Sequence, residues 1–158
     1  MTDPGATIAR FYAAFAERDH CTMAACYAAE ARFDDPVFPG LAGARIGLMW
    51  RMLCERATDL RIERGPVEVA GDRCRTVWQA WYTYSATGRP VHNRIGAEFL
   101  MADGFIREHR DHFSLHGWAR QALGVKGLLL GWAPPVQAAI RAQAGRALDA
   151  FIRRTDPG

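Results

Sequence analysis

Apolar side chains recur at helical spacing through the first third of the chain. Ile8, Phe11 and Phe15 lie three or four residues apart, which predicts an amphipathic helix over residues 7–17. The same reasoning predicts a second helix over residues 19–29, a short strand at 31–34, a loop at 39–43 and a third helix over 44–56. The first third of the chain is therefore expected to be mainly helical.

The pattern changes to strand alternation after residue 60. Alternating, β-branched and aromatic positions predict strands at residues 60–69, 73–85, 91–101 and 105–115. Turn residues separate these runs, and Asp103-Gly104 is typical of a tight hairpin. Three helices followed by a run of antiparallel strands indicate an α+β fold.

A last apolar pattern follows the strands. It predicts a helical turn at residues 118–123, an apolar loop over 127–135 (GLLLGWAPP) and a final helix over 135–153. Arginines lie mostly on the polar side of this final helix. Such a helix can lie on a membrane surface, but its modest, alanine-rich apolar side favours a lid or a docking helix.

Composition and charge narrow the function classes. The chain has 158 residues, 49% of them hydrophobic and 23% charged, which suits one globular domain. The net charge of +3 comes from scattered arginines with Lys126 as the only lysine, so we expect no nucleic-acid partner. No apolar run is long enough to span a bilayer, and the start does not resemble a signal peptide, so a soluble cytoplasmic protein is expected.

Paired carboxylates provide the first candidate chemistry. Asp34 and Asp35 precede Pro36 within the segment FDDPVFPG, residues 33–40, where apolar side chains flank them. Desolvation would raise the pKa of an acid in such surroundings and suit it to proton transfer near neutral pH. The alternative is that these carboxylates cap a turn before the proline. Asp35 is the candidate, while Asp34 is expected to face solvent or be structural.

A second candidate pair lies on the last strand. Strand alternation places His109 and Asp111 on one face, with Arg110 and His112 on the other. His109 and Asp111 could therefore serve as acid and base. The alternative is a structural salt link between Asp111 and an arginine such as Arg94 or Arg110.

We expect no metal site. His109 and His112 point to opposite faces of the strand, so one ion could not readily bind both, although His116 follows nearby. The four cysteines form no C-x-x-C pair.

Aromatic residues gather on the predicted hairpin and on the helices. Many such residues simply fill a core, but their excess also suits a pocket for a flat, apolar ligand. The candidate ligand-binding residues are Tyr12, Phe33, Trp50, Trp78, Tyr82 and Asn93.

The order of elements and several motifs resemble the nuclear transport factor 2-like superfamily, in its SnoaL-like branch. The segment IARFYAAFAERDHCTMAACYAAEARFDDPVFPG is similar to that family's first two helices and first strand, and the resemblance covers roughly residues 5–125. It implies a cone-shaped, curved antiparallel sheet packed on three N-terminal helices, with a pocket between them. We expect a SnoaL-like domain over residues 1–125 and, over 126–158, an apolar loop and helix that extend the same domain.

The resemblance also suggests residue roles. Asp35 matches the general base of ketosteroid isomerases, which also precedes a proline. That enzyme's oxyanion donors do not carry over, because Phe11 and Ala97 occupy their positions.

The motif His-Arg-Asp-His-Phe at residues 109–113 is similar to a motif of limonene-epoxide hydrolases, in which Asp111 matches a catalytic aspartate. The partner arginine and aspartate of that enzyme correspond here to Trp78 and Ala80. SnoaL-like cyclases use a pocket histidine and aspartate, and His109 with Asp111 could supply them.

The resemblance thus implies a pocket that binds a small hydrophobic or polycyclic molecule. Asp35, Asp111 and His109 would catalyse isomerisation, cyclisation or hydration without a cofactor. The alternative is a non-catalytic ligand-binding or dimerisation module of the same fold. Family members often form homodimers through the outer sheet face, and we expect the same here.

Overall fold

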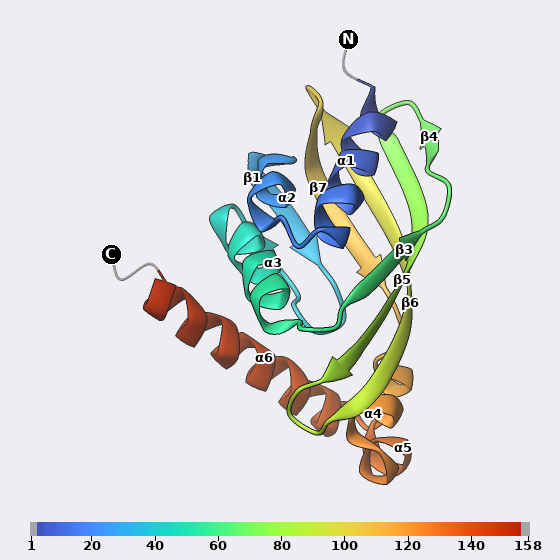
Figure 1. Ribbon diagram of the computed structural model, residues 1–158, viewed down its shortest axis with the longest axis vertical. Helices are drawn as coiled ribbons and strands as arrows, with labels where there is room; N and C mark the ends of the chain where they lie inside the picture. Colours follow the sequence, from blue (N-terminus) through green and yellow to red (C-terminus); the bar gives the residue numbers. More distant parts are fainter. Residues whose placement is uncertain (1–2, 156–158) are drawn as a thin grey trace.

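The computed structural model describes residues 3–155 and has helices packed against a curved sheet (Figure 1). The N-terminal helices are α1 (Pro4–Ala16), α2 (His20–Ala25) and α3 (Ala44–Arg56). The strands are β1 (Tyr27–Asp34), β2 (Leu41–Ala42), β3 (Arg61–Arg64), β4 (Glu68–Ala70), β5 (Arg73–Tyr84), β6 (Arg89–Ala102) and β7 (Phe105–His112). The expected α+β architecture is confirmed.

The sheet is mixed rather than wholly antiparallel. Its strand order is β2-β1-β7-β6-β5-β3, with β4 paired to β5. Strand β1 pairs with β7 in parallel, while the remaining pairs are antiparallel. Strand β1 is the parallel exception in a mostly antiparallel sheet, because it enters the sheet before α3 and lies beside β7, the last strand of the chain.

Local sequence signals set the ends of the first two helices. Asp3 caps α1 by accepting a hydrogen bond from the Gly5 N–H at 2.9 Å, and Pro4 begins the helix. Asp19 caps α2 through the Thr22 N–H at 3.0 Å. The second helix was expected to reach residue 29 but ends at Ala25, so Tyr27, predicted as helical, begins β1.

The predicted strand at residues 60–69 is two short strands. Gly65 donates its N–H to the Val77 carbonyl at 2.8 Å, and Pro66 has no N–H with which to continue the ladder. The chain therefore leaves β5 after β3 and returns to it as β4.

The C-terminal part contains three helices: α4 (Leu115–Leu123), α5 (Val125–Leu130) and α6 (Pro134–Thr155). Helix α5 occupies much of the segment that was predicted as a loop. Helix α6 runs below α3 (Figure 1), where Leu148 and Phe151 are buried and Arg45 pairs with Asp149 at 2.8 Å. Within residues 3–155, no helix is long and apolar enough to cross a bilayer.

Candidate functional site

Strand β7 presents His109 and Asp111 to the interior. Both side chains are buried, while Arg110 and His112 point outward and are exposed. The exposed His112 lies 3.2 Å from Glu98, on the opposite side of the strand from His109. In the described part of the chain, no group of His, Cys, Asp and Glu side chains is arranged to hold a metal ion.

The buried histidine links two polar groups. His109 Nε2 lies 2.8 Å from Asp111 Oδ1, and His109 Nδ1 lies 2.7 Å from the Tyr27 hydroxyl. The Trp50 indole N–H donates to the same hydroxyl at 3.0 Å. Asp111 therefore pairs with His109, rather than with either arginine of the salt-link alternative.

Only one direction in this chain of contacts is fixed by chemistry. An indole N–H can only donate, so the Tyr27 oxygen accepts from Trp50. Tyr27 in turn pairs with His109 Nδ1, and His109 Nε2 pairs with Asp111 Oδ1. The orientation of Asp111 is therefore fixed through three residues.

Aromatic rings enclose His109. The ring centroids of Phe99, Phe33 and Phe11 lie 4.2, 4.9 and 5.7 Å from the imidazole, and Trp50 stacks on it at 6.2 Å. The side chain of His109 is 0% exposed. In this packing, the His109 ring is enclosed by aromatic rings and contacts the Asp111 carboxylate.

The sequence left two alternatives for Asp35, a turn cap or a desolvated acid with a raised pKa, and the structure shows features of both. Its carboxylate accepts hydrogen bonds from the Val37 and Phe38 N–H groups at 2.7 and 2.6 Å, so it caps the turn after β1. Burial nevertheless raises its pKa from 3.8 to about 6, and the charge of Asp111 adds to this rise. The two backbone hydrogen bonds and His109 oppose the rise. The same carboxyl therefore caps a turn and titrates near neutral pH.

Two buried polar atoms near these acids have no hydrogen-bond partner among the described residues. They are the Tyr12 hydroxyl on α1 and the Trp78 indole nitrogen on β5. The two rings lie 5.9 Å apart. Burial raises the pKa of Tyr12 well above 10.0, and the charge of Asp111 contributes to the rise, which places this hydroxyl within the field of that carboxylate.

The other expected ligand-binding residues are distributed between the centre and the edge of this interior. Phe33 is fully buried with its ring 5.6 Å from Trp50. The Tyr82 hydroxyl accepts from the Trp118 indole N–H at 2.7 Å, and burial, with a smaller contribution from Asp35, raises its pKa. Asn93 is half-buried on the inner face of β6, opposite Ala80 of β5.

Helix α6 reaches this edge of the interior. The guanidinium of Arg141 donates to the carbonyl of Pro36 at 3.0 Å. The residue next to Asp35 is thus tied to the C-terminal helix.

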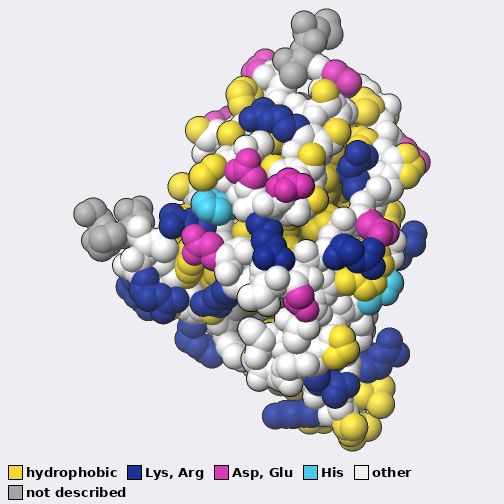
Figure 2. All heavy atoms as spheres, viewed as in Figure 1, with side chains coloured by type: hydrophobic (Ala, Val, Ile, Leu, Met, Phe, Trp, Pro, Cys, Tyr) yellow, Lys and Arg dark blue, Asp and Glu magenta, His cyan; other side chains and the backbone are white. Residues whose placement is uncertain are grey.

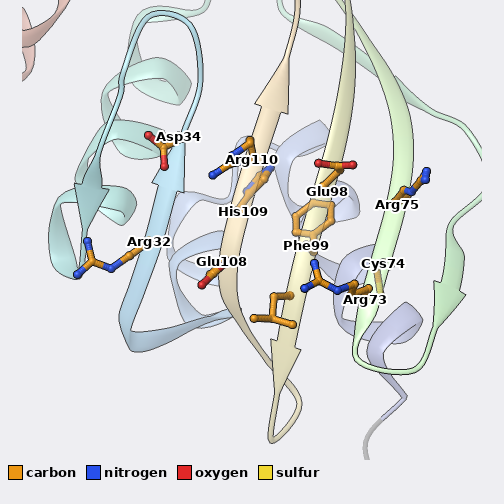
Figure 3. A pocket seen from close by; sticks show the side chains of 11 residues that line it. Arg32, Asp34, Arg73, Cys74, Arg75, Glu98, Phe99, Glu108, His109 and Arg110 are labelled. Atoms are coloured by element: carbon orange, nitrogen blue, oxygen red, sulfur yellow. The ribbon is translucent and has the colours of Figure 1, made fainter.

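The outer face of the sheet carries a separate, shallow depression of about 270 Å³ (Figure 3). Its exposed lining residues are charged and of both signs: Arg32, Arg73, Arg75, Glu98, Glu108 and Arg110. They belong to the side of the sheet opposite Asp111.

Three residues that contact the site were absent from the sequence prediction. Tyr27 was assigned to a helix, although polar residues at Glu30 and Arg32 alternating with Ala31 and Phe33 could have indicated a longer strand. Trp118 and Arg141 meet the site through tertiary contacts for which the sequence carries no local signal.

Comparison with known proteins places the chain in a family. A protein-family profile described as "SnoaL-like domain" matches residues 8–109. A comparison with curated protein sequences finds no match.

Several solved structures share the fold. An LEH-like epoxide hydrolase from M. tuberculosis is 17% identical with a TM-score of 0.64, over 83% of this chain and 96% of that one. A putative SnoaL-like polyketide cyclase from Jannaschia sp. CCS1 is 15% identical with a TM-score of 0.67, over 77% and 92%. A putative polyketide cyclase from Pseudomonas putida KT2440 is 20% identical with a TM-score of 0.62, over 77% and 98%. Because the profile covers more than half of its length, the chain belongs to the SnoaL-like domain family, and it has the nuclear transport factor 2-like fold.

Proposed function

We propose that this protein binds a small hydrophobic or polycyclic molecule between the sheet and helices α1 and α3, and that Asp35 and Asp111 carry out acid–base chemistry on it. The observation that carries the proposal is the Asp35 carboxyl, whose pKa is raised to about 6 by burial and by the charge of Asp111. A group with that pKa can both take up and release a proton near neutral pH. The reaction class is isomerisation, cyclisation or hydration without a cofactor.

Asp111 is the second acid–base group of the proposal. One of its oxygens accepts from His109, and no hydrogen bond within residues 3–155 reaches the other oxygen. That free oxygen is the natural acceptor for a substrate proton or for a water that attacks an epoxide. His109 is held by Tyr27. In this proposal, it orients Asp111 and shares a proton with the Asp111 carboxylate.

The unpartnered donors define what the ligand must offer. The Tyr12 hydroxyl and the Trp78 indole N–H are buried without partners, and such atoms cost stability unless a ligand or water satisfies them. A ligand oxygen that reaches either donor would accept its hydrogen bond. A ketone or enolate oxygen fits this description and would be stabilised there as negative charge develops.

One observation favours a non-catalytic module as the second candidate. The aromatic rings around His109, including Phe99 at 4.2 Å, fill space that a substrate would need. Trp78 is also buried, in contact with the rings of Tyr12 and Phe15. A protein that only pairs with a second copy or holds a small ligand at the edge would have such a filled interior.

The remaining expectations belong to the same proposal. The charges of both signs on the outer sheet face suit a homodimer interface there, because Arg73 and Arg75 could pair with the Glu98 and Glu108 of a second copy. Four free cysteines accord with a cytoplasmic location.

A boundary near residue 125 would separate the SnoaL-like domain from its C-terminal extension.

The test is turnover by the purified protein and two variants. The probes are a terpene epoxide, a β,γ-unsaturated ketosteroid and a polycyclic ketone, with products followed by mass spectrometry. Asp35→Asn and Asp111→Asn should each lower turnover about 100-fold or more while circular dichroism remains unchanged. Asp34→Asn is the matched control and should keep full activity. Binding without turnover of any probe would support the non-catalytic module, and the absence of both would remove the proposal.

A further inference from the structure

Helix α5 and the turn after it form an exposed apolar protrusion. Five of the exposed large hydrophobic residues in the described chain lie here, and the most exposed are Val125 at 71%, Trp132 at 63% and Leu129 at 62%. Leu128 and Leu130 are the other two. Figure 1 places α5 at the extremity of the molecule, beyond the end of the long β5–β6 hairpin.

Two glycines force these side chains outward. A Cβ at Gly127 would lie 1.9 Å from the Ala119 carbonyl oxygen of α4, and a Cβ at Gly131 would lie 2.8 Å from the Ala119 side chain. Only glycine permits this close approach, so one side of α5 is fixed against α4. The leucines and Val125 are then left on the other side, facing solvent.

Side-chain hydrogen bonds hold the same arrangement. His116 of α4 lies with its Nε2 3.0 Å from the Leu128 carbonyl, and the Trp132 indole N–H donates to the Leu129 carbonyl at 2.8 Å. The indole nitrogen is thus satisfied locally, and its ring stays exposed. The exposure of these apolar side chains is therefore fixed by contacts within the fold.

The surroundings of the protrusion are cationic. Residues 112–148 contain no Asp or Glu, and two cations of this range, Arg120 and Lys126, belong to α4 and α5 themselves. Arg89 joins them, since its Nε donates to the Gln121 carbonyl at the end of α4 at 2.8 Å. Figure 2 shows hydrophobic atoms at the lower tip with Lys and Arg atoms beside them and no acidic ones near.

We propose that this protrusion docks the protein onto the surface of an anionic lipid bilayer. A convex tip of leucine, valine and tryptophan matches the boundary between headgroups and acyl chains, where tryptophan is favoured. A basic rim matches the negative surface potential of anionic lipids. A second copy of this chain is a poorer occupant, because pairing two tips would bring Arg120 and Lys126 of each copy against the same charges of the other.

The experiment is vesicle co-sedimentation of the whole protein. We expect binding to phosphatidylcholine vesicles that contain about one quarter phosphatidylglycerol, little binding to pure phosphatidylcholine, and release by about 0.5 M NaCl. Trp132 is far more exposed than Trp50 or Trp78, at 2% and 7%. Binding should therefore shift the tryptophan emission to the blue, and Trp132→Phe should remove most of that shift.

Two variants distinguish binding through this protrusion from nonspecific hydrophobic adsorption. Leu128→Ser combined with Leu129→Ser should weaken binding about tenfold or more, without loss of fold by circular dichroism because both side chains point into solvent. Val69→Ser, at another exposed apolar position (47% exposed), is the matched control and should bind as the unaltered protein does.

Three results would overturn the proposal. The first is no binding of the unaltered protein to the anionic vesicles. The second is equal binding by the double-serine variant. The third is concentration-dependent self-association on a sizing column that the same double variant abolishes, since this would assign the surface to contacts between copies.

Discussion

Replacing Asp35 by Asn removes a carboxylate from an apolar interior while keeping its size and an acceptor oxygen. The amide oxygen can still accept from the Val37 and Phe38 N–H groups, so the turn is retained. What changes is the proton equilibrium. Folding raises the pKa of Asp35 from 3.8 to about 6, so the folded protein binds this proton more tightly than the unfolded chain does.

The sign of the effect follows from linkage. The stability that protonated Asp35 contributes is fully present below pH 3.8 and is lost as pH rises through about 6. Each pKa unit corresponds to about 1.4 kcal/mol, so a shift of this size costs at most about 3 kcal/mol above pH 6. Partial solvent contact reduces this cost, and we expect about 1–3 kcal/mol.

Urea unfolding at a series of pH values measures this difference. The free energies of unfolding of Asp35→Asn and the unaltered protein should be similar near pH 4. Above pH 6.5, the variant should be more stable by about 1–3 kcal/mol. Asp34→Asn is the matched control, because Asp34 accepts an exposed hydrogen bond from Gly40 at 2.7 Å, and it should retain the profile of the unaltered protein. Parallel profiles for Asp35→Asn and the unaltered protein would refute a desolvated, titrating carboxyl.

Three further predictions follow from contacts in the same interior and on α6. Tyr12→Phe should leave the free energy of unfolding unchanged or raise it by up to about 1 kcal/mol in chemical denaturation, whereas Tyr27→Phe should lower it by about 1–3 kcal/mol, because only the second hydroxyl has partners to lose. Asp111→Asn should lower the pKa of Asp35, which a carboxyl carbon NMR titration would detect, and an unchanged midpoint would contradict the charge coupling between them. Gly145→Ala should raise the free energy of unfolding by about 0.5–1 kcal/mol, since an added Cβ there meets nothing within 4 Å and glycine is unfavourable inside a helix; a lower melting temperature would count against this.

Elements with a strong, uninterrupted period were predictable from the sequence. Helix α3 spans residues 44–56, as its apolar stripe indicated, because that stripe contains no proline and the one glycine of the helix, Gly47, is not part of it. Alternation on β7 also correctly separated His109 and Asp111 from their outward-facing neighbours. In both cases the signal is local, and burial against one large core reinforces it.

Elements decided by tertiary contacts were not predictable in the same way. Tyr27 follows a helical pattern, but its strand is stabilised by pairing with Ile106, far along the chain. Helix α5 was not predicted, because glycines such as Gly127 and Gly131 normally indicate a loop. Their function here is close packing against Ala119, which becomes visible only once α4 and α5 are placed together.

The candidate site likewise has some features that local sequence patterns predict and others that depend on tertiary contacts. Sequence patterns identified Asp35 as an acid near apolar residues and Asp111 as an acid on the same strand face as His109. They did not reveal that the charge of Asp111 raises the pKa of Asp35, or that Tyr27 links His109 to Trp50. Residues more than 70 positions apart in the chain meet at this point, so no local window of sequence contains the relation between them.

The distribution of buried polar atoms without hydrogen-bond partners supports the proposal of a bound ligand. Buried polar atoms without partners destabilise a fold, and in the described chain Tyr12 and Trp78 supply such atoms. Asp35, whose charged form is disfavoured by burial, belongs to the same interior as Asp111. Phenylalanine at position 12 and asparagine at position 35 would serve folding at least as well, by the energies worked out above. The groups whose burial destabilises the fold thus lie in one region of the protein. A polar group of a bound molecule would form hydrogen bonds with the atoms that the protein itself leaves unpaired.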